Sequence, residues 1–108
     1  MDSLKIICDR QLEFMVQLGL FGADREMAIR DTCLALIVEA TEVLNETNWK
    51  PWKKTPKVLN EEKIKEEIID ALHFVIELAL LMEMRPLDIL KEYISKMEIN
   101  QKRQKGGY

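Results

Sequence analysis

The amino-acid sequence predicts an all-α fold of four principal helices in a single domain, residues 1–108. Apolar residues recur at steps of three and four along four segments, which is the period of an amphipathic helix. No segment shows the sustained apolar and polar alternation that is typical of a half-buried strand. The chain has 108 residues, of which 47% are hydrophobic and 32% charged, and this composition indicates one small globular domain.

The first two helices are expected at residues 3–18 and 24–46. Asp2 and Ser3 can cap the first helix, and Gly19 begins the break that follows it. The second helix is expected to turn its apolar stripe towards the core, and this stripe consists of Ile29, Cys33, Leu36, Ile37, Ala40 and Leu44.

A loop is expected over residues 47–60, where two prolines interrupt the helical pattern and two tryptophans and four lysines occur. Asn60 can cap a third helix, whose apolar stripe runs to Met82. Pro86 suits the first turn of a fourth helix, and a flexible tail is expected over residues 104–108. The fourth helix is expected to face inward with Leu87, Leu90, Ile94 and Met97.

Composition and charge also limit the classes of partner that the chain is expected to bind. The formal net charge of −3 gives no general reason to bind nucleic acid or a membrane, and the longest apolar stretch, residues 74–82, is too short to span a bilayer. Cys8 and Cys33 occupy apolar helical positions and are expected to be core residues in a reducing compartment, so we expect a cytoplasmic protein. Several helices are apolar on more than one side, which predicts that another subunit completes the core.

Two acidic pairs carry the strongest chemical signal. Glu39 and Glu42 lie in the second expected helix, and Glu67 and Asp70 lie in the third. Each pair is spaced i, i+3, so its two side chains point only about 60° apart on a helix. If the two helices lie side by side, four carboxylates converge, and like charges in such a space favour a bound cation. Magnesium prefers carboxylate oxygens and completes its coordination with water and substrate phosphate.

The alternative is an ordinary solvated face, because such spacings are common in a chain this rich in charge. The combination of two pairs with a basic helix end favours the metal site. Lys96, Asn100 and Arg103 stand at i, i+4 and i+7, so one stripe offers two cations and an amide to an anion.

The two tryptophans of the loop have two interpretations as well, and three other side chains are considered beside them. Trp49 and Trp52 can cap one end of the bundle, or they can stack against a nucleobase. An amide such as Gln11 can read the polar edge of a base. His73 and Phe74 lie one turn from the second acidic pair, and we assign His73 to the lining of a pocket because magnesium does not favour imidazole.

The chain resembles the all-α nucleoside triphosphate pyrophosphohydrolase superfamily, which includes the MazG proteins, and within it the dimeric dUTPase branch. The two acidic pairs, with 24 residues between them, are similar to the superfamily pattern. More restrictive motifs are similar to the dimeric dUTPases: Glu39-Ala-Thr-Glu42-Val-Leu-Asn45-Glu46, Trp49-Lys-Pro-Trp52-Lys, Glu66-Glu67-Ile-Ile-Asp70-Ala-Leu-His73-Phe74, and Lys96-x-x-x-Asn100-x-x-Arg103-Gln104-x-x-Gly107-Tyr108.

The resemblance implies hydrolysis of dUTP to dUMP and pyrophosphate with two or more Mg²⁺ ions, for which Mn²⁺ can substitute. It implies metal ligands at Glu39, Glu42, Glu67 and Asp70 and a catalytic role for Glu42 and Glu39, with Glu42 as the base that assists an attacking water. It further implies a phosphate grip by Lys96, Asn100, Arg103 and Tyr108, and a base and sugar pocket formed by Gln11, Trp52, His73 and Phe74.

Two other functions compete with a dUTPase. The first is a MazG-like house-cleaning pyrophosphatase that acts on dCTP or modified nucleotides, and the second is a noncatalytic helical dimerisation module. The chain is shorter than dimeric dUTPases usually are, which leaves the nucleotide preference open. Because compact members of the superfamily build their bundles by association, we expect a homodimer or a dimer of dimers.

Overall fold

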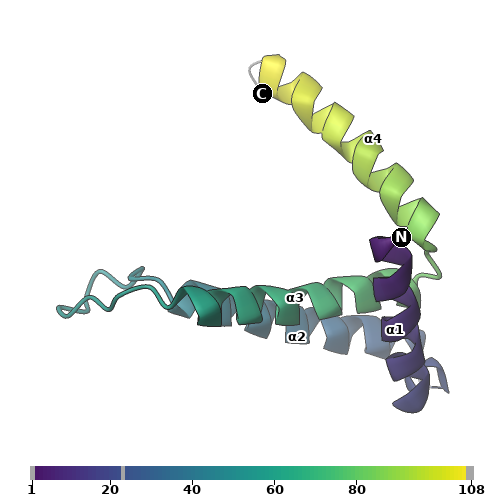
Figure 1. Cartoon of the computed structure of the whole chain (residues 1–108), viewed down its shortest axis with the longest axis horizontal. Coiled ribbons are helices and arrows are strands. Elements are labelled where there is room, and N and C mark those ends of the chain that lie inside the picture. The colour runs from purple at the N-terminus through teal and green to yellow at the C-terminus, as the bar shows by residue number, and fades with distance from the viewer. Residues whose placement is uncertain (1, 23, 107–108) are drawn as a thin grey trace.

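The computed structural model describes residues 2–22 and 24–106, which form four α-helices and one short 3₁₀ turn. The elements are α1 (Ser3–Gln17), η1 (Leu20–Gly22), α2 (Arg25–Asn45), α3 (Glu61–Leu81) and α4 (Pro86–Lys105). Figure 1 shows them in chain order. No strand occurs within the described residues, so the prediction of an all-α fold with four principal helices is confirmed.

Side-chain caps fix where the first three helices begin. Asp2 accepts a hydrogen bond from the backbone N–H of Lys5 at 3.0 Å, and Asn60 accepts one from Lys63 at 3.1 Å. Asp24 caps α2 in the same way. These bonds satisfy N–H groups that have no partner inside the first turn of a helix. The helix starts expected from the sequence are therefore confirmed.

The start of α4 is stabilised in a different way. Pro86 occupies the first helical position, and the Asp88 side chain accepts a hydrogen bond from the backbone N–H of Arg85 at 2.9 Å. The helix then continues to Lys105. Residues 104 and 105, which we had assigned to the tail, are thus helical, and residues 107 and 108 lie outside the described part of the chain.

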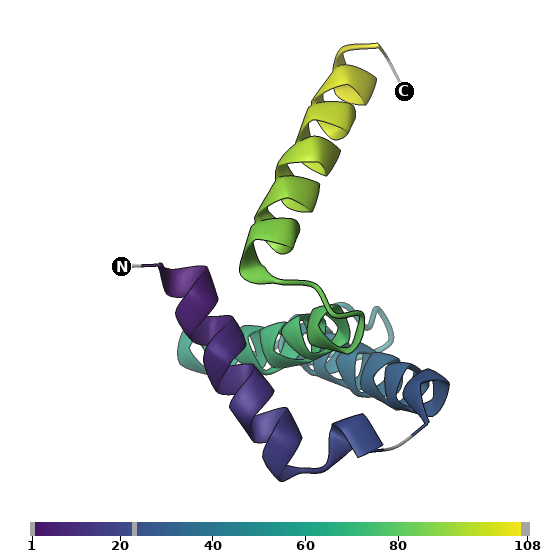
Figure 2. The ribbon, with the colours of Figure 1, turned by 90° about the vertical axis from the view of Figure 1, so that its right-hand side faces the viewer.

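The helices α2 and α3 form an antiparallel hairpin that is joined by the loop over residues 46–60 (Figure 1). The helix α1 crosses α3 at the end of the hairpin away from this loop (Figures 1 and 2). The helix α4 contacts α1 and extends away from the hairpin in both views. The hairpin is thus the body of the molecule, and its loop end is not covered by another helix of the same chain.

The hydrophobic core is small and lies where α1 crosses α3. Its buried members are Cys8, Met15, Ile76, Leu80 and Leu81. Two hydrogen bonds tie α2 to α3 near this core. The hydroxyl of Thr32 donates to the buried carboxyl group of Glu77 at 2.6 Å, and Nε of Arg25 donates to the carbonyl oxygen of Leu81 at 3.1 Å. The hairpin is therefore anchored at one end and extends from there.

The predicted inward face of α2 is partly wrong. Cys33 is exposed, and Ile37 and Leu44 are exposed as well, whereas Cys8 is buried as expected. The buried residue of α2 is Thr32, because its hydroxyl pairs with the carboxyl group of Glu77. The pattern of apolar residues does not indicate a polar contact of this kind. It therefore predicts a buried face at Cys33, one residue further along the helix than Thr32.

The predicted inward face of α4 is also exposed in this chain. Leu87, Leu90, Ile94 and Met97 are between 40% and 58% exposed, because only Ile89 near the start of α4 packs against the core. In the described residues, none of the helices has the length and apolarity that would let it cross a membrane.

Candidate metal and nucleotide site

Three carboxyl groups meet on one side of the α2–α3 hairpin. Glu39 on α2 and Glu67 and Asp70 on α3 each offer an oxygen, and these oxygens lie within 4.8 Å of one another. The antiparallel packing brings the second half of α2 beside the first half of α3, and the i, i+3 spacing places both α3 acids on one face. We call this group of three the acidic cluster.

Glu42 lies one turn beyond Glu39 and stands outside the acidic cluster. Its side chain is exposed, whereas the three members of the cluster are half-buried. It is nevertheless near enough for its charge to raise the pKa of Glu67. The structure thus brings three of the four expected ligands together and leaves Glu42 in contact with water beside them.

The electrostatics of the acidic cluster favour a bound cation. Loss of hydration raises the pKa of the Glu67 carboxyl group above its usual value, and the negative charge of Asp70 is the next largest cause. Because the folded pKa is the higher one, ionisation of Glu67 lowers stability as the pH rises through this range. A divalent cation bound between these carboxylates would offset the repulsion between their negative charges. A set of carboxylate oxygens without nitrogen or sulfur ligands suits Mg²⁺ or Mn²⁺.

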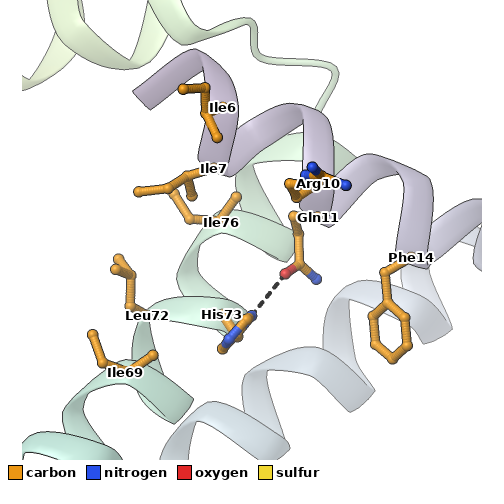
Figure 3. Close-up of a pocket in the computed structure, with 9 residues that line it drawn as sticks. All are labelled: Ile6, Ile7, Arg10, Gln11, Phe14, Ile69, Leu72, His73 and Ile76. Atoms are coloured by element: carbon orange, nitrogen blue, oxygen red, sulfur yellow. Dashed lines mark hydrogen bonds between the residues drawn. The ribbon is translucent and has the colours of Figure 1, made fainter. Parts of the chain in front are cut away.

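A cavity of about 330 Å³ lies between α1 and α3 (Figure 3), and none of the three acids of the acidic cluster lines it. Nδ1 of His73 lies 3.0 Å from Oε1 of Gln11, and Gln11 is only 7% exposed. His73 follows Asp70 by three residues, so this one residue of the lining lies a turn along α3 from the acidic cluster, while Ile69, Leu72 and Ile76 lie on another face of the helix. The remaining lining is mostly apolar and consists of Ile6, Ile7, Arg10, Phe14, Ile69, Leu72 and Ile76.

The Gln11–His73 pair leaves a defined donor in this cavity. In the tautomer that carries the proton on Nδ1, His73 donates to the amide oxygen of Gln11. The amide NH₂ of Gln11 is then left to donate to a ligand. A buried amide held in this way can distinguish a carbonyl oxygen from an amino group.

The loop at the end of the hairpin is held by side-chain hydrogen bonds. The Asn48 amide donates to the carbonyl oxygen of Lys57 and accepts from its backbone N–H, both at 2.9 Å. Glu46 lies within 4.0 Å of the ammonium groups of Lys57 and Lys63, so its charge is already paired. This explains why Glu46 does not belong to the acidic cluster. Asn48 breaks the helical pattern of the sequence, but a contact between residues nine positions apart is not indicated by any local turn pattern.

A model of the dUTPase family matches residues 9–88, which include the acidic cluster, Gln11 and His73. The chain belongs to the dUTPase family. Neither a curated protein nor a solved structure matches the chain significantly. The family match ends in the first turn of α4, so the basic stripe further along that helix lies outside it.

Two of the expected pocket residues of this dUTPase-family chain lie elsewhere. Trp52 is 67% exposed in the loop and packs edge-on against Trp49, with ring centroids 5.7 Å apart. Phe74 lines another cavity, of about 270 Å³, between η1, α2 and α3. His73 and Phe74 are consecutive and therefore point about 100° apart on α3. Only Gln11 and His73 of the four proposed pocket residues meet in this chain.

The expected phosphate-binding residues do not reach the acidic cluster within one chain. Lys96, Asn100 and Arg103 are exposed on α4, which diverges from the hairpin in Figures 1 and 2. Tyr108 lies outside the described residues. The dUTPase-family chain therefore presents its acidic and basic groups on separate parts of the molecule.

Replacement of Glu67 by Gln should stabilise the metal-free protein at pH 7, because it removes an ionised group whose folded pKa is raised. In wild-type protein, Mg²⁺ at one hundred times its Kd is expected to stabilise the fold by about 2.7 kcal/mol. Glu67→Gln should reduce this gain strongly. Thermal unfolding with and without Mg²⁺ measures both effects.

The matched control for this prediction is Glu66→Gln, which removes the same charge from an exposed neighbouring position outside the acidic cluster. Glu66→Gln should retain the wild-type response to Mg²⁺. Equal responses of the two variants would contradict the assignment of Glu67 as a ligand.

Proposed function

We propose that this protein is a Mg²⁺-dependent nucleoside triphosphate pyrophosphohydrolase that converts dUTP to dUMP and pyrophosphate. The observation that carries the proposal is the acidic cluster between α2 and α3, in a chain of the dUTPase family that also has a cavity of ligand size between α1 and α3. Small-molecule sites commonly enclose about 300–1,000 Å³, have mostly apolar walls and contain a few polar groups. The cavity between α1 and α3 has this character.

Glu39, Glu67 and Asp70 are the side chains that would hold magnesium. When bound, the metal would neutralise phosphate charge and increase the acidity of a water molecule. Glu42 is assigned as the general base, because it is exposed beside the acidic cluster and can accept a proton from water. Glu39, which lies one turn before Glu42 on the same helix, is the second candidate for this role and also orients the metal.

The base specificity is assigned to Gln11 and His73. The amide NH₂ of Gln11 would donate to the carbonyl oxygen at position 4 of uracil, while His73 holds the amide oxygen. At the same position cytosine carries an amino group, so a donor would face a donor. The apolar side chains of Ile69, Leu72 and Ile76 would cover the base and the deoxyribose.

A second candidate is a pyrophosphatase of broader choice, similar to MazG proteins. It is favoured by one observation, the position of Trp52 in the loop, where it does not line the cavity. Without the Trp52 ring over the base, discrimination against larger bases would be weaker. A noncatalytic dimerisation module is a third candidate, and it requires neither the acidic cluster nor the Gln11–His73 pair.

Purified protein with Mg²⁺ should release pyrophosphate from dUTP faster than from dCTP, dTTP or oxidised nucleotides. The double variant Glu39→Gln/Asp70→Asn should lower kcat/KM for dUTP by at least about a hundredfold, equivalent to about 2.7 kcal/mol of transition-state stabilisation. Pyrophosphate release measures both results, and Glu66→Gln serves as the charge-matched control.

Equal rates on all four nucleotides would favour the broader pyrophosphatase. Absence of hydrolysis in wild type, or an unchanged rate in the double variant, would contradict the proposal.

Replacement of Gln11 by Leu should reduce the preference for dUTP over dCTP by about tenfold, because one hydrogen-bond donor is worth about 1.4 kcal/mol in such a comparison. The ratio of kcat/KM values for the two nucleotides measures this effect. Leu18→Ala, at the exposed residue that caps the end of α1 outside the cavity, should keep the wild-type ratio. A wild-type ratio in Gln11→Leu would remove Gln11 from base recognition.

A further inference from the structure

The cavity of about 270 Å³ between η1, α2 and α3 has no role in the proposed function, and a buried carboxyl group lines it. Glu77 on α3 is only 7% exposed, and its Oε2 accepts a hydrogen bond from the hydroxyl of Thr32 at 2.6 Å. This bond holds the carboxyl group in one direction. We call the space that it lines the Glu77 cavity.

The other oxygen of this carboxyl group, Oε1, has no hydrogen-bond donor within residues 2–22 and 24–106. In that part of the chain, no buried side-chain oxygen is both without a partner and sealed from solvent, so Oε1 of Glu77 is open to the cavity. Buried polar atoms in proteins are almost always hydrogen-bonded. An open acceptor in this position therefore indicates a donor that comes from a ligand.

The negative charge of Glu77 is also not neutralised by the described residues. None of their lysine or arginine nitrogens lies within 4.0 Å of the carboxyl group. Arg25, two turns before Thr32 on α2, donates instead to the carbonyl oxygen of Leu81 at 3.1 Å. A buried carboxylate without a counter-charge is costly, so this position favours a cationic ligand.

The walls of the Glu77 cavity decide which kind of cation fits. They are mostly apolar and come from Leu20, Met27, Ala28, Ala35 and Phe74. A magnesium ion keeps several waters and needs several oxygen ligands, which such walls do not offer. An ammonium group on an aliphatic chain suits them, because its charge pairs with the carboxylate while its methylene groups are buried. The aromatic ring of Phe74 adds a surface that attracts cations.

Two further carboxyl groups lie on the solvent side of the Glu77 cavity. Asp24 and Asp31 both line it, and both are exposed. Asp31 also lies 3.4 Å from Nε of the exposed Arg30. An exposed ion pair contributes little alone, but it can add to the affinity of a ligand that is already anchored elsewhere. The arrangement thus matches a ligand with an ammonium group at each end of a short aliphatic chain.

We propose that the Glu77 cavity binds an aliphatic diamine. One ammonium group donates to Oε1 of Glu77, the methylene chain lies against Leu20 and Phe74, and the second ammonium group faces Asp24 and Asp31. The bound diamine contacts η1, α2 and α3 together, so it stabilises the folded hairpin by mass action.

The Glu77 cavity and the acidic cluster are neighbours on the hairpin, but they share no side chain. Phe74 follows Asp70 by four residues on α3, and Ala35 precedes Glu39 by four residues on α2. Each step is about one helical turn. Because the acidic cluster also attracts cations, the test has to separate the two places.

Isothermal titration calorimetry of the full chain with diaminobutane, at about 0.15 M salt, tests the proposal. Wild-type protein should bind diaminobutane more tightly than butylamine, and butanol, which has the same apolar chain without the charge, should not bind measurably. Glu77→Gln should weaken the binding of diaminobutane by at least about tenfold, because hydrogen bonds to charged groups are strong. The glutamine still accepts from the hydroxyl of Thr32, so this variant should fold, which thermal unfolding checks.

Three further variants locate the amine. Glu66→Gln removes the same charge from an exposed position outside both sites and should bind diaminobutane as wild type does. Asp31→Asn should reduce the advantage of diaminobutane over butylamine, because only the second ammonium group faces this residue. Glu39→Gln/Asp70→Asn should keep the wild-type affinity, because these acids do not line the Glu77 cavity.

Absence of measurable diaminobutane binding in wild type, or equal affinity in wild type and Glu77→Gln, would overturn the proposal. Loss of binding in Glu39→Gln/Asp70→Asn with retention in Glu77→Gln would place the amine at the acidic cluster and overturn it as well. None of these measurements uses nucleotide hydrolysis, so the diamine site and the proposed function can fail separately.

Discussion

The antiparallel packing of α2 against α3 holds three carboxyl groups from two helices within 4.8 Å of one another. The proposed metal-binding part of the candidate site depends on this contact. It is maintained at the far end of the hairpin, where the Thr32–Glu77 and Arg25–Leu81 hydrogen bonds and the core under α1 join the helices. The stable end of the hairpin thus holds together an end that like charges would otherwise separate.

The crossing of α1 over α3 adds the second half of the site. It brings Gln11 against His73, and His73 lies one turn along α3 from Asp70. The apolar walls of the cavity come from the same crossing. The proposed chemistry and the proposed specificity thus depend on two packing contacts that share α3, the first with α2 and the second with α1.

Much of the fold follows from local signals in the sequence. The caps Asp2, Asp24 and Asn60 and the proline at residue 86 fix the helix starts, and these signals act over only a few residues. The convergence of Glu39 with the α3 acids also follows, because the i, i+3 spacing defines a face. Which side of α2 and of α4 faces the core was harder to predict. Thr32 is buried by a polar contact, and α4 leaves the hairpin, so apolar periodicity misplaced both inward faces.

The composition of the pocket could not be derived from spacing alone. Gln11 and His73 are 62 residues apart, and their contact depends on how α1 crosses α3. Phe74 was grouped with His73 because they are adjacent in sequence, yet adjacent helical residues face different sides. Trp52 was placed near the base by its resemblance to a motif, whereas it is exposed in a loop that Asn48 holds at the other end of the hairpin.

The most direct test of the central claim is a crystal structure with Mn²⁺ and a nonhydrolysable dUTP analogue, in which anomalous scattering locates the metal. The account predicts an anomalous peak coordinated by oxygens of Glu39, Glu67 and Asp70, with the uracil beside Gln11. A peak elsewhere, or a nucleotide bound away from the acidic cluster, would contradict it.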